Sequence, residues 1–129
     1  MADTATGLSG VWRSTYRYTS SGRTGDFTSE HLVRLKQQGT SLVIESLPRD
    51  SRSSLLIRLS LQGNIATGSW QEETDPHGYY KGAVYHGVLQ MVLHDDGKSM
   101  HGRWLGYGKD MQINVGPWDL AYVGDTAPA

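Results

Sequence analysis

Short runs of β-forming residues, separated by turn sequences at regular intervals, are the feature that most restricts how this chain can fold. Apolar side chains recur at every second position, as Leu55, Ile57, Leu59 and Leu61 show directly. A period of two is typical of a strand with one buried face, whereas a helix needs a period of about 3.6. No stretch between residues 7 and 123 has a helical pattern, so the sequence predicts an all-β fold.

Eight such runs follow one another along the chain. The predicted strands cover residues 11–19, 27–37, 41–47, 54–61, 65–72, 79–93, 99–106 and 111–123. We expect the sixth run to be bent or bulged near Gly82 and Gly87, and the eighth to be interrupted at Gly116 and Pro117. The links are mostly short and resemble hairpin turns, so consecutive strands are expected to pair as antiparallel neighbours.

The number of strands and the short links favour a closed sheet. An open meander of eight strands would leave two unpaired edges, and closing the sheet removes both. We therefore predict an eight-stranded antiparallel up-and-down β-barrel, with a β-sandwich as the alternative. The 129 residues suffice for one domain, residues 1–129, with an ordered core over about residues 7–123. The interior of such a barrel is filled by side chains or holds one small ligand.

Charge and cysteine content exclude several classes of function. Twelve Lys and Arg against thirteen Asp and Glu give a formal charge of −1, which predicts no direct binding to nucleic acid or to an anionic membrane. The absence of cysteine removes disulfides, thiolate chemistry and cysteine-ligated zinc. The first residues show no signal-peptide pattern and no apolar stretch has membrane-spanning length, so we expect a cytoplasmic protein without membrane contact.

The sequence contains no motif for catalysis or for a cofactor. It has neither a Gly-x-Ser-x-Gly nucleophile elbow nor a phosphate-binding Gly-x-x-x-x-Gly-Lys sequence. Glu45, Glu72 and Glu73 lie in predicted strands, but the sequence does not identify a partner that would make one of them a general acid. The five histidines have no metal-ligand spacing; they are His31, His77, His86, His94 and His101. We expect no catalytic residue, no metal and no cofactor.

Aromatic residues that carry a polar group are the main indication of a binding site. The chain has seven Tyr and four Trp but one Phe, and this excess favours a polar pocket because Phe would serve a plain core equally well. Residues 75–86 hold three tyrosines and two histidines, and this segment is the densest candidate. The predicted ligand-binding residues are Tyr16, Arg34, Tyr79, Tyr85, His86, Arg103, Trp104 and Tyr107.

Two alternatives stay open for the cationic residues within strands, which are Arg13, Arg17, Arg34, Lys36, Arg58 and Arg103. One or two of them inside the barrel would form an anion-binding floor with the tyrosines, and otherwise they are exposed partners of acidic residues. The aromatic rings likewise stack on a planar ligand or fill the core. A solid interior packed by Trp12, Trp70, Trp104 and Trp118 would exclude the ligand-sensor interpretation, whereas a roomy pocket lined by Tyr and Arg would favour it.

Residues 10–13, Gly-Val-Trp-Arg, resemble the Gly-x-Trp signature of the calycin barrels, which include lipocalins, fatty-acid-binding proteins and avidins. The resemblance implies that Trp12 plugs the closed end of the barrel. Residues 100–108 and 113–120 resemble the late strands of an avidin-type barrel. The polar residues that hold biotin in the first two avidin strands have no counterparts here.

Over residues 7–123 the chain resembles a β-rich domain of actinobacterial proteins, often found behind an XRE-type helix-turn-helix in transcriptional regulators. The residues that carry this resemblance are 16–23 (YRYTSSGR), 35–39 (LKQQG), 78–87 (GYYKGAVYHG) and 102–108 (GRWLGYG). The resemblance implies an accessory sensor or interaction domain. The sequence has no helix-turn-helix, so direct DNA binding is not implied.

These observations predict a small-molecule-binding sensor barrel in a regulatory or signalling setting. The ligand is expected to be planar, anionic or both, as a nucleotide is, with Tyr79, Tyr85, His86, Arg103 and Trp104 at the mouth. The alternative is a protein-interaction or scaffolding module with a filled barrel. The expected partners are a small-molecule ligand and, as an open alternative, a protein partner or a second copy of the chain.

Overall fold

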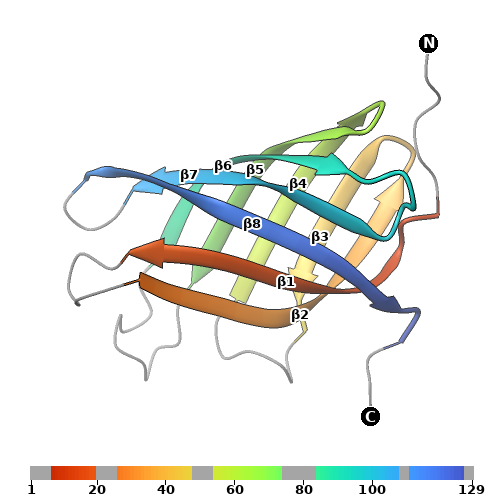
Figure 1. The fold of residues 1–129 in the computed structure, drawn as a ribbon, viewed down its shortest axis with the longest axis horizontal. Helices are drawn as coiled ribbons and strands as arrows, with labels where there is room; N and C mark the ends of the chain where they lie inside the picture. The colour runs from red at the N-terminus through yellow and green to blue at the C-terminus, as the bar shows by residue number, and fades with distance from the viewer. Residues whose placement is uncertain (1–6, 20–25, 48–53, 74–83, 108–110, 127–129) are drawn as a thin grey trace.

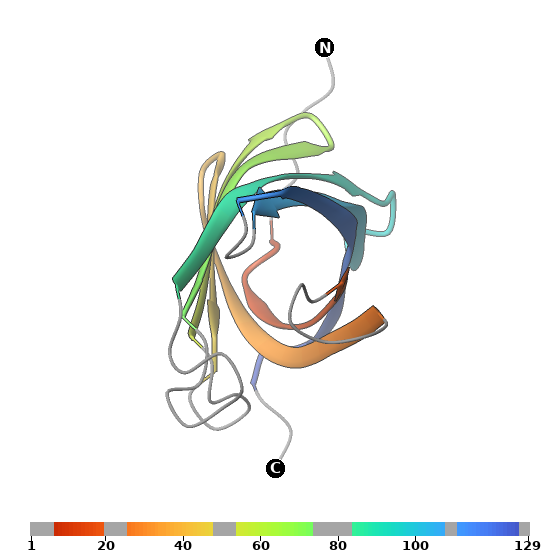
Figure 2. The same ribbon diagram turned by 90° about the vertical axis from the view of Figure 1, so that its left-hand side faces the viewer.

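The protein forms a closed antiparallel β-barrel in a computed structural model that describes residues 7–19, 26–47, 54–73, 84–107 and 111–126. The strands are β1 (Gly10–Thr19), β2 (Asp26–Gln38), β3 (Ser41–Ser46), β4 (Ser54–Gln62), β5 (Ile65–Glu73), β6 (Val84–Leu93), β7 (Ser99–Tyr107) and β8 (Ile113–Gly124). Each strand pairs with its neighbours in sequence, and β1 also pairs with β8 (Figure 1). Figure 2 shows the strands encircling the interior. The predicted up-and-down barrel is confirmed.

No helix in the described residues is long and apolar enough to cross a membrane.

The predicted interruption of the eighth strand was wrong, and so was a bulge at Gly87. β8 continues through Gly116 and Pro117, which pair with Trp104 and Arg103 of β7. The pairing of β8 with β1 stops at Trp118, so Pro117 occupies an edge position where its missing N–H is tolerated. The pairing of β6 is regular at Gly87, and residues 79–83, including Gly82, lie outside the described residues.

The two ends of the barrel differ in how the strands are joined. Short turns at residues 39–40, 63–64 and 94–98 connect β2 to β3, β4 to β5 and β6 to β7, and we call this the turn end. Gly39, Gly63 and Gly97 have positive φ angles there, which glycine adopts without strain. The opposite end, the loop end, is where β1, β3, β5 and β7 finish.

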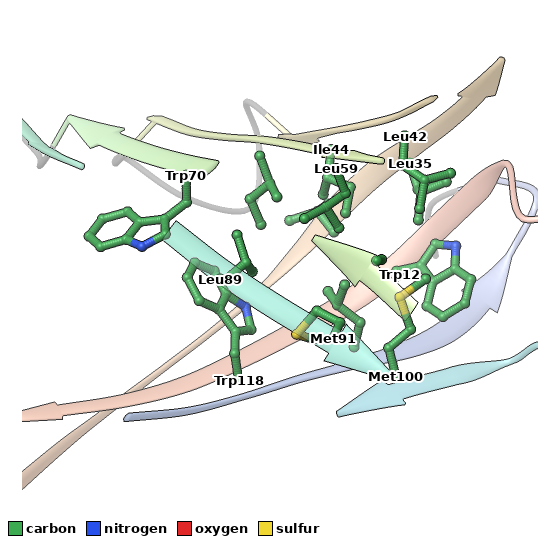
Figure 3. Packing of buried hydrophobic residues seen from close by; sticks show 14 of the residues in the cluster. Trp12, Leu35, Leu42, Ile44, Leu59, Trp70, Leu89, Met91, Met100 and Trp118 are labelled. Atoms are coloured by element: carbon green, nitrogen blue, oxygen red, sulfur yellow. The ribbon is translucent and has the colours of Figure 1, made fainter. Parts of the chain in front are cut away.

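The interior at the turn end is filled by apolar side chains. Trp12 is fully buried, donates a hydrogen bond from Nε1 to the Leu8 carbonyl oxygen at 2.9 Å, and packs edge-on against Tyr122. Figure 3 shows Trp12 at one side of the core and Trp70 and Trp118 at the other. Side chains that pack between and around them include Leu35, Leu42, Ile44, Leu59, Leu89, Met91 and Met100. In this part of the barrel the described residues form an ordinary hydrophobic core.

Glycines on the inner surface give the larger rings their space. A Cβ atom at Gly106 would lie 2.6 Å from Cζ2 of Trp70, and a Cβ atom at Gly116 would lie 2.6 Å from Nε1 of Trp104. At separations this short, a side chain at either position would force the ring or the backbone to shift. The indole rings of Trp70 and Trp104 therefore lie against bare backbone of β7 and β8, which explains part of the high glycine content.

Candidate functional site

Four aromatic side chains pack together inside the barrel, and we call Tyr16, Trp70, Trp104 and Trp118 the aromatic cluster. The ring centroids of Tyr16 and Trp118 are 4.7 Å apart, those of Trp118 and Trp70 are 6.0 Å apart, and those of Trp70 and Trp104 are 5.9 Å apart. These separations lie in the range of favourable aromatic contacts. The cluster joins β1, β5, β7 and β8 across the interior.

Each indole N–H of the cluster has a hydrogen-bond acceptor within the protein. Trp118 donates to Ser14 Oγ at 2.8 Å. Trp104 donates to the Arg17 carbonyl oxygen at 3.0 Å, and Trp70 donates to the Leu105 carbonyl oxygen at 3.3 Å. These bonds hold the rings in place and satisfy their polar atoms. The tryptophans of the cluster are therefore buried side chains with satisfied polar atoms.

A hydrogen bond crosses the interior beside this cluster. The Tyr16 hydroxyl on β1 donates to Oε2 of Glu72 on β5 at 2.7 Å. Because β1 and β5 are four strands apart in a closed sheet of eight, this bond joins opposite walls. Ser29, which pairs with Tyr16 in register, also hydrogen-bonds the phenol, and Tyr85 lies directly opposite Glu72 on β6.

Burial shifts the ionisation of both groups. Loss of solvation raises the pKa of Glu72 above its ordinary value of 4.5, and the Tyr16 hydrogen bond partly opposes that rise. Burial raises the pKa of the Tyr16 phenol well above 10.0, and the neighbouring Glu72 charge adds to this effect. No ion pair within the described residues involves Glu72. The interior therefore holds an acidic group that lacks a cationic partner in the described part of the chain.

We expect the stability difference between the wild-type protein and Glu72→Gln to depend on pH. The folded state holds the Glu72 proton more tightly than the unfolded state does. The contribution of protonated Glu72 to the free energy of unfolding is therefore fully present below about pH 4.5 and is lost as pH rises through the raised pKa. The melting temperature of Glu72→Gln, measured relative to that of the wild-type protein, should therefore increase from pH 5 to pH 8. A difference that stays constant over this range would contradict the shift. Glu73→Gln is the matched control because Glu73 is exposed.

The structure divides the predicted ligand-binding residues between the two faces of the barrel wall. Tyr16, Tyr85 and Trp104 face the interior and pack with the core. The residues on the outward face are Arg34, His86, Arg103 and Tyr107. Tyr79 lies outside the described residues. The described residues of the set therefore do not converge on one site.

The outward residues form contacts of their own. Tyr107 Oη and His86 Nε2 are 2.5 Å apart, and their rings meet edge to face. His86 also borders a groove of about 350 Å³ on the outer surface, whose other lining residues are Leu56, Arg58, Ser69, Trp70, Gln71 and Gly87. This groove lies over β4, β5 and β6, on the other side of the wall from the Tyr16–Glu72 bond.

The alternative of an anion-binding floor is wrong for the described interior. Arg13, Arg17, Lys36, Arg58 and Arg103 are exposed, and Arg34 alternates with the buried residues of β2. Arg13 Nε lies 3.6 Å from Glu30 Oε1 on the outer surface. A cationic side chain in the lumen would need a buried anionic partner. The strand cations instead face outward, as the other alternative expected.

No family model, no curated protein and no solved structure matches the chain.

The described histidines lie in separate places. His31 is buried edge-on to Tyr16, and His86 contacts Tyr107. His94 Nε2 and His101 Nδ1 are 2.6 Å apart on the exposed surface near the turn end. The part of the chain that the structure describes contains no group of three or more His, Cys, Asp or Glu residues arranged to hold a metal ion. His77 lies outside it.

Sequence reasoning missed the partner of Glu72 and did not include Glu72, Trp70 or Trp118 among the ligand-binding residues. The local signal for Glu72 was present, because it follows the buried Trp70 by two positions and so shares its inward face. Its partner Tyr16 is 56 residues away in sequence. Only the closure of the barrel brings the two together.

Proposed function

We propose that this protein is a small-molecule-binding barrel that holds a planar ligand at its loop end. The observation that carries the proposal is the Tyr16–Glu72 hydrogen bond across the lumen, next to the rings of Trp70, Trp104 and Trp118. Both residues of this pair are only half-buried in the described structure. Ring faces and a hydrogen-bonding carboxylate are the groups that a planar polar ligand uses.

The contrast between the two ends of the barrel supports the proposal. The turn end is filled by aliphatic side chains, methionines and Trp12, which is all that a core requires. Towards the loop end the inward side chains include Tyr16, Ser29, Glu72 and Tyr85. Burying such polar groups has a free-energy cost that a plain core avoids. A binding role gives a reason for their presence.

The sequence supports an anionic group on the ligand. Residues 20–25, 48–53, 74–83 and 108–110, which lie outside the described residues, contain five Lys or Arg and three Asp in sequence. Their cationic residues are Arg23, Arg49, Arg52, Lys81 and Lys109. We propose a ligand with a planar ring and an anionic group, such as a nucleotide, because it matches both the aromatic rings and the excess of cationic residues in these segments of the sequence.

The setting we propose is that of a sensor domain of a cytoplasmic regulatory or signalling protein. The resemblance to the β-rich domain of actinobacterial regulators and to calycin barrels supports this part of the proposal. In such a domain ligand binding would stabilise the loop end relative to the free form, since a ligand that binds only the folded state raises its stability.

The proposal is tested by intrinsic tryptophan fluorescence and thermal unfolding with nucleotides, biotin and fatty acids. We expect a nucleotide to change the fluorescence and to raise the melting temperature, since a ligand at 100 times its Kd adds about 2.7 kcal/mol. Trp104→Phe should weaken this response because it removes part of the aromatic cluster and its hydrogen bond to the Arg17 carbonyl oxygen, whereas the outward Tyr107→Phe should not. If saturating concentrations of every compound leave both signals unchanged, the proposal fails.

A second candidate function is protein interaction, and an exposed apolar surface favours it. Val88, Leu105 and Val115 are neighbours in register on the outer face of β6, β7 and β8, and their exposed fractions are 53%, 40% and 61%. Val84 and Ile113 are also exposed on these strands. Contiguous apolar surface of this kind often marks an interface.

We propose a second copy of the chain as the partner, which predicts a dimer that Leu105→Lys converts to a monomer in light scattering.

A further inference from the structure

The Glu72 carboxylate has a hydrogen-bonding capacity that the described residues do not fill. Its Oε2 accepts one bond from Tyr16, at 2.7 Å. A carboxylate has two oxygens and accepts about four hydrogen bonds. In the described part of the chain, Oε1 of Glu72 has no hydrogen-bond partner and no cation pairs with the group. Glu72 therefore presents an unused acceptor to the interior.

Glu72 is positioned so that a planar ligand would reach this acceptor with its edge. Its neighbour Tyr85 on β6 and its partner Tyr16 on β1 are both half-buried rings, and Tyr16 lies against Trp118. A ring that stacks on these aromatic faces directs its edge at the surrounding polar groups. The polar group here is an acceptor, so the matching edge consists of donors.

No described side chain near the loop end offers the interior a cation that would hold an anionic edge. The strand arginines and Lys36 lie on the outer surface. An inward-facing carboxylate would repel a ligand carboxylate or phosphate placed against it. We therefore expect an anionic group of the ligand to lie outside the barrel interior, and the ring inside the barrel to carry hydrogen-bond donors.

From these observations we propose that Glu72 selects planar rings whose edge presents two adjacent N–H donors. Such an edge forms two parallel hydrogen bonds with one carboxylate, and this bidentate geometry adds both strength and selectivity. Two sources share this chemistry: a charged amidine attached to a ring, and the neutral N1–H and N2–H₂ edge of guanine. The inference rests on the proposed ligand-binding function and specifies the chemistry of its ligand.

The test uses isothermal titration calorimetry of the full chain with two matched pairs of probes. Benzamidine and benzoate share a ring and differ in whether the edge donates or accepts. Guanosine and inosine share a purine and differ only in the N2 amino group. We expect each donor-rich probe to bind at least tenfold more tightly than its matched partner. Guanosine makes one more charge-assisted hydrogen bond with the carboxylate than inosine does, and benzamidine makes two whereas benzoate makes none and is repelled.

Glu72→Gln should remove this preference, because the amide replaces one acceptor oxygen with a donor of nearly equal size. Glu73→Gln is the matched control: Glu73 is adjacent in sequence and exposed on the outer face, so its variant should keep the wild-type preference. Thermal unfolding of both variants at pH 7 establishes that each is folded.

The outcomes separate the inference from the proposed function. Selectivity for benzamidine alone assigns a cationic ligand, and selectivity for guanosine alone assigns a nucleobase; either supports the inference. Equal affinities within both pairs, or tighter binding of benzoate, overturn the inference and leave ligand binding intact. Absence of heat from all four probes overturns the inference, and the nucleotide, biotin and fatty-acid panel then decides the proposed function separately. A preference that survives in Glu72→Gln also overturns the assignment to Glu72.

Discussion

Gly68→Ala is expected to leave little folded protein. A Cβ atom at Gly68 would lie 1.8 Å from the carbonyl oxygen of Arg58 and 3.0 Å from Cα of Leu59, both in the backbone of the paired strand β4. Backbone atoms cannot turn aside as a side chain does, so β4 and β5 would have to separate. Losses above about 4 kcal/mol are exceptional for one substitution, and we expect such a loss here. That is a large part of a domain's typical stability of about 5–15 kcal/mol.

Two other glycine substitutions provide controls for this prediction. Gly63 lies in the turn between β4 and β5 with φ of 64° and no atom near its missing side chain, so Gly63→Ala should cost about 1–2 kcal/mol of backbone strain. Gly124→Ala should be close to neutral, because the nearest atom is 3.7 Å away. Circular dichroism and thermal unfolding measure the order of stability of the three glycine variants. If Gly68→Ala melts at the same temperature as Gly63→Ala, the predicted clash between a Cβ atom at Gly68 and the Arg58 carbonyl oxygen is wrong.

The fold could be predicted because its signals are local in sequence. Alternation from Leu55 to Leu61 fixes the inward face of β4, and short turns such as residues 63–64 leave antiparallel pairing as the simplest arrangement. The interruption predicted in β8 failed for a non-local reason. Pro117 is compatible with a continuous strand only because β1 no longer pairs with β8 at that position.

The candidate site could be predicted only in part. Alternation already implies that Trp104 and the adjacent Arg103 face opposite sides of the wall, as do Tyr85 and His86, so the predicted set mixed two surfaces. Which of the two faces is inside follows from the packing of the whole barrel. The Tyr16–Glu72 contact needs more, since it forms between opposite walls of the closed sheet.

The sequence presented a filled barrel and a ligand-binding barrel as alternatives, and the described interior has features of both. Trp12 and its aliphatic neighbours fill the turn end. Trp70, Trp104 and Trp118 are buried in the same core cluster as Trp12 and the strand arginines face outward, as a filled barrel requires. The features that favour a ligand-binding barrel are the half-buried polar residues of the loop end, Tyr16, Glu72 and Tyr85. In our proposal the tryptophans of the aromatic cluster therefore belong to the core and support the half-buried rings of Tyr16 and Tyr85, which provide the ring surface.

Trp118→Ala is expected to produce a large loss of stability together with a loss of ligand response. Trp118 is 1% exposed and packs against both Tyr16 and Trp70. Replacing a buried Trp by Ala costs about 3–5 kcal/mol through lost contacts and the cavity that remains. The buried Ser14 hydroxyl also loses its donor, which adds about 1 kcal/mol or more. We expect the melting temperature to fall by about 10 °C or more.

Two further variants separate the causes of this loss. Trp118→Phe keeps an aromatic ring beside Tyr16 but removes the N–H that bonds Ser14, so its melting temperature should lie between those of the wild-type protein and Trp118→Ala. Asp119→Asn on the same strand should stay within about 0.5 kcal/mol of the wild-type protein because Asp119 is exposed. The ligand-induced change in fluorescence should depend on an aromatic ring at position 118. We expect it to be retained in Trp118→Phe and lost in Trp118→Ala when the latter is measured below its melting temperature. A full response in folded Trp118→Ala would show that Tyr16 needs no support from Trp118 and would place the ligand away from the aromatic cluster.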